Sequence, residues 1–313
     1  MTIKAQFPEE ASAEGTFERQ DDAFRDWVRA DGSTEYAAQA GRYHLYVSLA
    51  CPWASRTVIV RKLKGLEAAI GMTVVDPIRD ERGWRFLREE PDPLNGWAFL
   101  SEAYFASDPA YRARVTVPVL WDRERRRIVS NSDDDILRML ETRFEEFACN
   151  PIDLYPQALR GEIDALDDWV YERVNDGVYR AGFATSQTVY EAAAYALFEA
   201  LDRLEERLAT RRYLFGPVPL ETDWRLFPTL VRFDAVYHGH FKCNLRRIAD
   251  YPNLFGYLRD LYQYPKVAAT VNFDHIKRHY YYTHDDINPT RIVPIGPDQD
   301  LSAPSGRERL AWE

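Results

Sequence analysis

Features that would mark several common classes of protein are missing from this 313-residue sequence. Its three cysteines, Cys51, Cys149 and Cys243, are too few and too scattered for a disulfide framework or a cysteine-based metal cluster. It has neither an apolar run of about 18 residues, the length of a membrane-spanning helix, nor the basic, apolar and small-residue pattern of an export signal. We therefore expect a protein of the reducing cytoplasm that does not associate with a membrane.

Basic residues are also in deficit, which bears on the partners of the protein. Lysine and arginine number 40 against 50 for aspartate and glutamate, so the formal net charge is −10. A chain of this charge is not expected to bind nucleic acid nonspecifically. It also has no glycine-rich loop that could hold a phosphate group, so a nucleotide cofactor is not indicated.

The histidines include two close pairs, His238 with His240 and His275 with His279. A spacing of four could place the second pair on one face of a helix, where two imidazoles could bind a metal ion. No acidic residue accompanies them in a recognised metal-binding motif. We predict no metal site and no tightly bound cofactor, and we expect the histidines to organise polar contacts.

What the sequence does contain is a cysteine at a predicted junction between a strand and a helix. The run from Tyr43 to Ala50 reads as a strand, and Pro52 directly follows Cys51. Proline suits the first helical turn, so Cys51 is expected at the N-cap with an exposed thiol. A helix N-terminus can lower a cysteine pKa from about 8.5 to roughly 3.5–7.5, which favours the nucleophilic thiolate. The alternative is a buried, inert cysteine.

A second proline signal lies further along the chain. Pro118 interrupts the β-rich run 116–121, which favours a turn or a cis peptide bond at the entrance of a strand. A short strand at 126–130 follows, and the small polar and acidic residues 131–135 are typical of a helix start. The order of strands and helices predicts a thioredoxin-like α/β domain over residues 41–146.

The rest of the chain is predicted to be mainly helical. Apolar residues recur at helical spacing between Tyr190 and Leu208, with charged residues on the opposite face. The pattern breaks around Cys149, which we interpret as a linker between two domains. The remaining expected parts are an N-terminal extension at 1–40, an insertion or lid at about 80–111, an all-helical domain at 152–284 and an extended tail at 285–313.

Cys-Pro-Trp-Ala at 51–54 and Val-Pro at 117–118, followed by a long helical remainder, resemble the glutathione transferase superfamily and, within it, the glutathionyl-hydroquinone reductases or xi class. The likeness extends over nearly the whole chain. Further strings typical of the class lie at residues 153–156, 175–184, 226–234, 236–244 and 272–281. The resemblance implies an α/β N-terminal thioredoxin-like domain, an all-α C-terminal glutathione-transferase domain and a homodimer formed through the helical domain.

The resemblance also implies a reaction. In the family, the cysteine matching Cys51 attacks the sulfur of a glutathionyl-hydroquinone, releases the hydroquinone and retains glutathione as a mixed disulfide, which a second glutathione then reduces. Trp53 and Ala54 follow Pro52, so a Cys-x-x-Cys partner is missing and the second thiol has to come from solution.

A proton donor is needed because the leaving group is a carbon of an aromatic ring. Family members place tyrosines over this ring, and the matching positions are Tyr179 and Tyr280, with Tyr281 as a less certain neighbour. With 19 tyrosines in the chain, packing with a satisfied hydroxyl is the alternative for each of them.

The resemblance further implies residues that hold the thiol. Val117, which precedes the expected cis-Pro118, would offer its backbone N–H and C=O to the cysteinyl part of glutathione. Trp84 matches a tryptophan that packs on glutathione, although it could instead be a core residue of the insertion. Trp53 and Arg56 are candidates for supporting the thiolate or substrate, with a salt bridge on the helix face as the alternative for Arg56.

The sequence departs from the family where the γ-glutamyl group is held. Ser132-Asp133 stand where family members usually have Glu-Ser, and a carboxylate at Asp133, with Asp134 and Asp135 beside it, would repel a ligand carboxylate. Alternatively, Asp133 caps the helix, or Asn131-Ser132 serve instead. The cosubstrate is thus expected to be glutathione or another low-molecular-weight thiol such as mycothiol. A noncatalytic binder of thiol adducts, or a redox sensor, is the alternative from another class of function.

Overall fold

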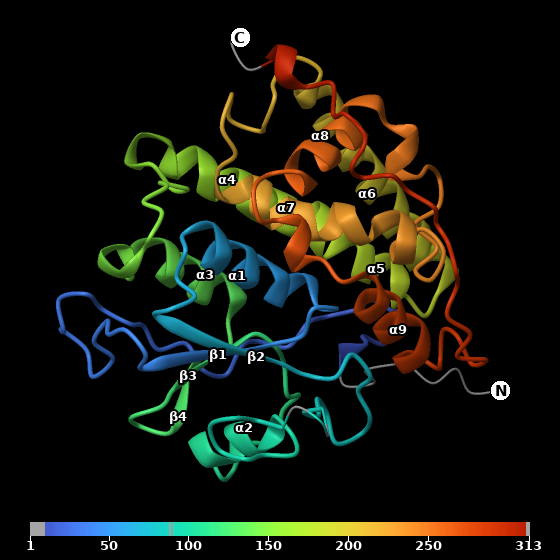
Figure 1. Cartoon of the computed structure of the whole chain (residues 1–313). Helices are drawn as coiled ribbons and strands as arrows, with labels where there is room; N and C mark the ends of the chain where they lie inside the picture. The colour runs from blue at the N-terminus through green and yellow to red at the C-terminus, as the bar shows by residue number, and fades with distance from the viewer. Residues whose placement is uncertain (1–9, 88, 90, 311–313) are drawn as a thin grey trace. The chain divides into compact units, whose positions relative to one another are not determined.

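The computed structural model describes residues 10–87, 89 and 91–310 (Figure 1). The chain divides into two compact units, each of which is described by itself. The sheet unit comprises Asp21–Ile152 and Ala269–His279, and the helical unit comprises Met1–Gln20, Asp153–Ala268 and Tyr280–Glu313.

The sheet unit is built on four strands in the order β2-β1-β3-β4. The strands are β1 (Tyr43–Val47), β2 (Ile70–Val74), β3 (Val119–Asp122) and β4 (Arg127–Ser130). β1 pairs in parallel with β2 and antiparallel with β3, and β3 pairs antiparallel with β4. All five side chains of β1 are buried, as expected for a strand in the middle of a sheet with covered faces.

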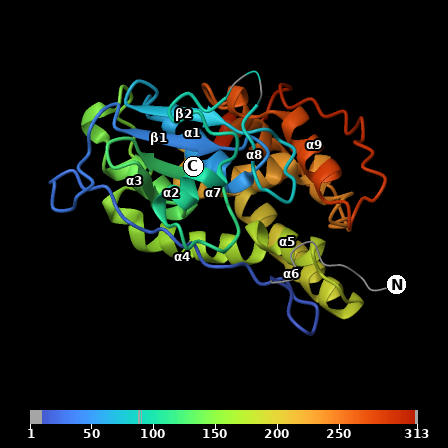
Figure 2. The same cartoon turned by 90° about the horizontal axis from the view of Figure 1, so that it is seen from below.

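Helices connect and cover this sheet (Figures 1 and 2). They are α1 (Pro52–Leu63), α2 (Ser101–Ser107) and α3 (Asp133–Thr142), with a short 3-10 helix at Glu145–Phe147. Parallel strands require a crossover connection, which α1 supplies between β1 and β2. The Val117–Pro118 peptide bond before β3 is cis, as predicted. This arrangement confirms the predicted thioredoxin-like fold.

The helical unit contains most of the remaining helices. They are α4 (Arg160–Val170), α5 (Gly177–Gly182), α6 (Gln187–Leu208), α7 (Glu221–Arg232) and α8 (Pro252–Tyr262), with short 3-10 helices at Gln157–Leu159, Ile248–Asp250 and Glu308–Leu310. A 3-10 turn at Ala268–Thr270 and helix α9 (Phe273–Thr283) are shared between the two units. π-helical segments at Tyr171–Asn175 and Phe233–Tyr237 follow α4 and α7.

Helix α6 shows why the sequence pattern folds in this way. Its N-cap is Ser186, whose hydroxyl accepts a hydrogen bond from the backbone of Val189 at 3.4 Å. One face of the helix is buried along its length, at Ala194, Leu197, Phe198, Ala200, Leu201, Leu204 and Leu208. The helix predicted between Tyr190 and Leu208 is therefore confirmed, and it extends one turn further at its start.

The chain ends are attached to these units by specific contacts. Residues 21–40 lie along the sheet, where the Asp26 amide donates to Val129 and the Asn131 amide to Phe24. In the tail, buried Arg307 donates to the backbone oxygens of Leu208 and Arg211. Because these oxygens lie at and just beyond the end of α6, the arginine satisfies carbonyls that the helix leaves unpaired. Among the described residues, no helix has the length and apolar character of a membrane span.

Candidate active site

Cys51 is the N-cap residue of α1. Its Sγ accepts a hydrogen bond from the Ala54 amide at 3.5 Å, and Pro52 occupies the first position of the helix. The first turn of α1 contains no acidic residue. The free N–H groups of a helix N-terminus stabilise negative charge, so this position suits a thiolate. The prediction of an exposed thiol is wrong, because Cys51 is only 9% exposed.

The thiol of Cys51 also lies against the strand entrance that the sequence singled out. Its Sγ is 3.5 Å from the carbonyl oxygen of Val117, to which the protonated thiol donates. Val117 precedes Pro118 in the cis peptide bond. The fold thus brings the predicted nucleophile against the predicted strand entrance, although Cys51 and Val117 are 66 positions apart in the sequence. We call Cys51, Trp53, Arg56, Val117, Pro118 and Asp133 the thiol cluster.

Arg56 of α1 contributes a positive charge to the thiol cluster and pairs with two acids of α3. Its Nη1 is 2.7 Å from Oδ2 of Asp133 and 3.6 Å from Oδ1 of Asp134. Its guanidinium group also lies 4.6 Å from the ring centroid of Trp53. Since Arg56 is 1% exposed, the pair with Asp133 joins α1 to the first turn of α3 in a poorly solvated setting.

The sequence suggested that the acids at the start of α3 would repel a ligand carboxylate, but in the structure they form ion pairs. Asp133 is paired with Arg56, and Asp135 is paired with Arg25 at 2.7 Å, so opposite charges offset both carboxylates. The proposal that Asp133 caps the helix is also wrong. The cap is Ser132, whose Oγ accepts from the Asp135 amide at 3.4 Å, while Asp133 is the first helical residue.

Trp84 lies buried in the sheet unit and stacks on a histidine. Its ring centroid is 4.9 Å from that of His279, with 23° between the planes. Nδ1 of His279 lies 2.7 Å from the carbonyl oxygen of Pro77, which fixes the imidazole. These contacts fix the position of the indole within the sheet unit.

The two predicted tyrosines of the helical unit are in direct contact. The hydroxyl oxygens of Tyr179 and Tyr280 are 2.6 Å apart, and that of Tyr237 is 3.1 Å from Tyr280. We call Tyr179, Tyr237 and Tyr280 the tyrosine trio. Tyr179 lies on α5, Tyr237 ends a π-helical segment and Tyr280 lies on α9. Short π-helical segments often accompany functional sites because they change the direction of side chains.

Burial makes the hydroxyl of the central member of the tyrosine trio harder to ionise than that of an ordinary tyrosine. Tyr280 is 1% exposed, and burial raises its pKa well above the ordinary value. The neighbouring hydroxyls of Tyr179 and Tyr237 raise the pKa further, while Arg232 acts in the opposite direction. A neutral phenol of this kind is available as a hydrogen-bond and proton donor.

Tyr281 has a different environment. Its hydroxyl donates to the carbonyl oxygen of Ala235 at 3.2 Å, and its ring centroid is 4.7 Å from that of His240. His240 in turn contacts His284, with 3.2 Å between Nε2 and Nδ1, and burial lowers the pKa of His240 to about 4. Among the described residues, no group of three or more histidine, cysteine, aspartate or glutamate side chains is arranged to hold a metal ion.

Comparison with known proteins identifies the family. The N-terminal domain of glutathione S-transferases matches residues 50–143, and their C-terminal domain matches residues 187–260. Glutathionyl-hydroquinone reductase YqjG of Escherichia coli is 52% identical over 95% of this chain and 94% of that protein. The chain belongs to the glutathione S-transferase family. Glutathionyl-hydroquinone reductase PcpF of Sphingobium chlorophenolicum is 49% identical over 93% of this chain and 92% of its own.

Solved structures of glutathione transferases, including one of the xi class, have the same fold. The glutathione-bound structure of YqjG has a TM-score of 0.88 at 52% identity and covers 91% of this chain and 96% of that one. A xi-class transferase from Natrialba magadii has a TM-score of 0.92 at 50% identity, and the match covers 96% of this chain and 93% of that one. This chain therefore combines the α/β thioredoxin-like domain with the all-α domain that its sequence predicted.

Tyr237 of the tyrosine trio and Arg19, whose guanidinium lies over the ring of Tyr179, were not predicted from the sequence. Tyr237 lies within a family string, but nothing in its neighbourhood distinguishes it from the other tyrosines. Arg19, whose guanidinium lies 5.0 Å from the ring centroid of Tyr179 and pairs with Asp176 at 3.2 Å, belongs to the segment expected to be an accessory extension. No local signal identifies Arg19, because its contacts depend on the tertiary fold.

Proposed function

We propose that the protein is a thiol-dependent reductase that removes glutathione from S-glutathionyl-hydroquinones. The proposal rests on the position of Cys51 at the N-cap of α1, beside the carbonyl of Val117. It is supported by the names of two relatives of about half-identical sequence, both of which are glutathionyl-hydroquinone reductases. Cys51 is the proposed nucleophile, and a helix N-terminus supplies the setting that favours its thiolate.

The reaction divides into two displacements at sulfur. The Cys51 thiolate attacks the sulfur of the aryl thioether, so a new S–S bond forms and the carbon–sulfur bond breaks. The ring carbon takes the bonding electron pair and then a proton, which gives the free hydroquinone. A second glutathione thiolate attacks the mixed disulfide, releasing glutathione disulfide and the Cys51 thiolate. In the net change, the thioether sulfur of the substrate and the sulfur of the second glutathione become joined as a disulfide, and this two-electron oxidation balances the reduction of the ring carbon from C–S to C–H.

We assign the proton to the tyrosine trio. Tyr280 is held neutral by burial, and its hydroxyl is 2.6 Å from that of Tyr179, so either phenol can donate while the other replenishes it. Tyr237 completes the chain of hydroxyl groups at 3.1 Å from Tyr280. In this assignment Tyr281 supports the helical unit through its bond to Ala235.

Glutathione is the proposed cosubstrate. The related YqjG structure is bound to glutathione, and in this chain Arg56 offsets the carboxylate of Asp133, which removes the main argument against a γ-glutamyl group. Val117, Pro118, Ser132 and Trp84 are the proposed thiol-holding residues. We further infer a homodimer formed through the helical domain, without a tightly bound cofactor, in the cytoplasm.

Turnover distinguishes this function from that of a binder or sensor. A catalytic amount of protein is mixed with a glutathionyl-hydroquinone and excess glutathione, and hydroquinone is followed by chromatography. Many equivalents released per protein support the reductase. A single stoichiometric burst would contradict it, and equal or faster turnover with mycothiol in place of glutathione would contradict the assigned cosubstrate.

A further inference from the structure

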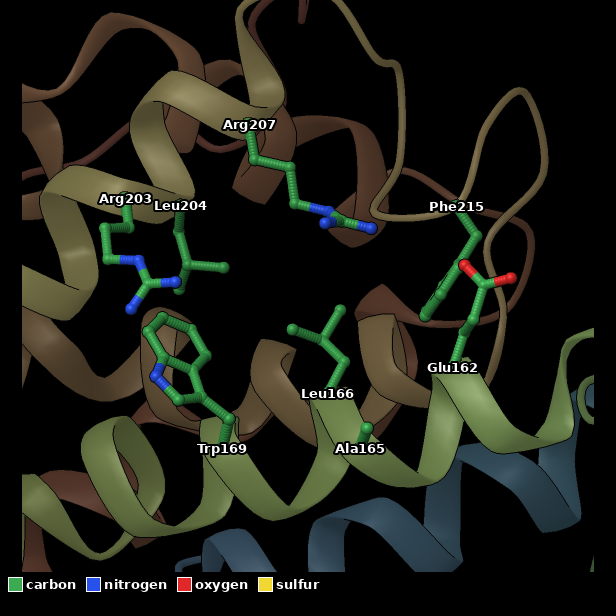
Figure 3. A pocket seen from close by; sticks show the side chains of 8 residues that line it. All are labelled: Glu162, Ala165, Leu166, Trp169, Arg203, Leu204, Arg207 and Phe215. Carbon is green, nitrogen blue, oxygen red and sulfur yellow. The ribbon is translucent and has the colours of Figure 1, made fainter.

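A cavity of about 480 Å³ lies in the helical unit, apart from the tyrosine trio. Its walls come from α4, from α6 and from the loop that follows α6 (Figure 3). The volume falls in the range of small-molecule sites, roughly 300–1,000 Å³. Neither the thiol exchange nor the proton transfer proposed above uses a residue of this cavity.

Apolar side chains form much of the lining of the cavity. Leu166 and Trp169 of α4 point into the cavity from one side, and Leu204 of α6 points into it from the opposite side. Phe215 lies at one end of the cavity (Figure 3). Leu204 is buried, whereas Leu166, Trp169 and Phe215 remain partly exposed. Apolar and aromatic groups in a concave surface favour a flat, apolar ligand, because contact with it removes their area from water.

Two arginines of α6 also line the cavity, and each lies over one of its aromatic rings. The guanidinium of Arg203 is 4.8 Å from the ring centroid of Trp169, and that of Arg207 is 5.5 Å from that of Phe215. Nε of Arg207 donates to the carbonyl of Leu214 at 2.9 Å, which fixes the direction of its side chain. Within the described part of the chain, neither arginine forms an ion pair.

The lack of ion pairs is informative because α6 does contain acids. Asp202 pairs with Arg246 at 2.5 Å, and Glu205 accepts from Asn253 at 2.9 Å, so these carboxylates are engaged with other partners. The acid that lines the cavity is Glu162 of α4, which lies at the end occupied by Phe215 (Figure 3). In a chain with a net charge of −10, two arginines without carboxylate partners over one cavity form a local positive site.

We propose that this cavity is a binding site for a planar aromatic anion, such as an aromatic carboxylate. The ring lies on Leu166 and Leu204, beside the stacked Arg203 and Trp169, and the anionic group accepts hydrogen bonds from Arg203 and Arg207. Arginine suits such a group because its planar fork can donate two parallel hydrogen bonds. Glu162 is a specificity residue, since its carboxylate opposes an anion placed near Arg207.

Binding of 2-naphthoate to the full-length protein, measured by isothermal titration calorimetry, tests the proposal. Arg203→Gln and Arg207→Gln are each expected to raise the dissociation constant about tenfold, as for the loss of one charge-assisted hydrogen bond. Arg203→Gln leaves the bond between Arg207 and Leu214 intact, so the test does not depend on the folding of a single variant. Glu162→Gln is expected to lower the constant about twofold to threefold, and the gain should shrink with salt.

Two controls show whether binding depends on charge at the cavity itself. Arg173→Gln removes the same charge from an exposed residue that does not line the cavity, and it should leave affinity unchanged. The alcohol 2-naphthalenemethanol, which has the ring without the charge, should bind at least tenfold more weakly.

Equal affinity of wild type and both arginine variants would overturn the proposal. An altered sedimentation coefficient in a variant that carries both Arg203→Gln and Arg207→Gln, with naphthoate affinity unchanged, would also overturn it, because the face would then serve self-association.

Discussion

The thiol cluster of the sheet unit and the tyrosine trio of the helical unit are both buried, yet they handle charge in opposite ways. In the thiol cluster, buried Arg56 forms an ion pair with Asp133 at 2.7 Å. In the tyrosine trio, burial raises the pKa of Tyr280 and keeps its hydroxyl neutral. The first setting compensates charges, and the second prevents a charge from forming.

This difference matches the two halves of the proposed chemistry. A nucleophilic sulfur has to become negative, so it needs a helix N-terminus without acidic competitors, which α1 provides. A proton donor has to remain protonated until the ring carbon needs the proton. A tyrosine is already neutral near pH 7, and burial extends the neutral form to higher pH. The following changes test this division, beginning with the largest expected effect.

Replacing the nucleophile should abolish the reaction without disturbing the fold. Cys51→Ser is expected to lower the turnover number on the order of 10⁴-fold, because a hydroxyl at this position is a far weaker nucleophile towards sulfur. Serine fits the same volume and can accept from the Ala54 amide, so the melting temperature should change by only a few degrees. Hydroquinone release and thermal unfolding are the two measurements.

The other cysteines provide matched controls. Cys149 is exposed and lies outside the thiol cluster, whereas Cys243 is buried and burial raises its pKa above the ordinary value, which disfavours its thiolate. Cys149→Ser and Cys243→Ser should keep turnover within a few fold of wild type. Near-normal turnover in Cys51→Ser would refute the assigned mechanism and remove the thiol cluster from the chemistry.

Removing a hydroxyl from the tyrosine trio should slow proton transfer. Tyr280→Phe and Tyr179→Phe are each expected to lower the rate of hydroquinone release roughly 10²–10⁴-fold. The rate of the second half-reaction, in which glutathione reduces the mixed disulfide, should be unchanged because it forms no carbon–hydrogen bond. Single-turnover kinetics of the two half-reactions separates these effects.

Tyr281→Phe is the control for this comparison, because Tyr281 donates to the backbone of Ala235 and not to the trio. It should retain turnover within a few fold. If Tyr280→Phe and Tyr179→Phe raised the KM for the adduct and left turnover unchanged, the trio would have a binding role and the proton would come from elsewhere.

Breaking the ion pair of the thiol cluster should impair the step that uses free glutathione. Arg56→Gln removes the guanidinium 2.7 Å from the Asp133 carboxylate, so we expect the KM for glutathione to rise about tenfold, an effect that salt should reduce. Loss of one partner of a buried pair also lowers the free energy of unfolding by about 3–5 kcal/mol. Urea unfolding and initial rates at several glutathione concentrations measure both effects.

The double variant with Asp133→Asn is the decisive control, since it also removes the carboxylate nearest to the lost guanidinium, at 2.7 Å, and leaves only the more distant Asp134 at 3.6 Å. It should recover most of the affinity and most of the stability. Arg25→Gln, which breaks the pair with Asp135 on the same helix, should leave the KM nearly unchanged. An unaltered KM in Arg56→Gln would mean that Asp133 has no influence on the ligand.

The thiol cluster was largely predictable from the sequence because its signals are local. A cysteine followed by proline after a strand-like run indicates an N-cap, and a proline at a strand entrance indicates the partner segment. The ion pair between Arg56 and Asp133 could not be predicted, since it depends on how α1 packs on α3 across 77 positions of sequence. For this reason the sequence alone suggested repulsion at Asp133.

The tyrosine trio was only partly predictable. Tyr179 and Tyr280 were identified by resemblance to the family, but they lie 101 positions apart and neither has a local signal that predicts their contact. The π-helical segment that ends at Tyr237 changes the direction of that side chain in a way that helical periodicity does not reveal. Burial of Cys51 was also missed, because an N-cap position does not determine what covers it.

A buried acid in the helical unit extends the comparison to stability. Asp167 and Glu221 share the guanidinium of Arg225, at 3.1 and 2.6 Å, so two carboxylates face one positive charge. Burial raises the pKa of Asp167 to about 8, with Arg225 lowering it and Glu221 raising it. The acid is therefore held neutral like Tyr280, in contrast to Asp133.

The sign of the pH effect follows from this shift. The folded protein retains a proton that the unfolded chain, with an aspartate pKa of about 3.9, has released. The stabilisation is complete below pH 4 and is lost as pH rises towards 8, so the free energy of unfolding should fall with pH in this interval.

Asp167→Asn, which stays neutral throughout, should flatten the profile and unfold at a higher temperature than wild type at pH 9. Asp168→Asn, an exposed neighbour on the same helix, should leave the profile unchanged. Parallel profiles for wild type and Asp167→Asn between pH 4 and 9 would mean that Arg225 compensates both carboxylates, and that the helical unit pairs its buried charges as the sheet unit does.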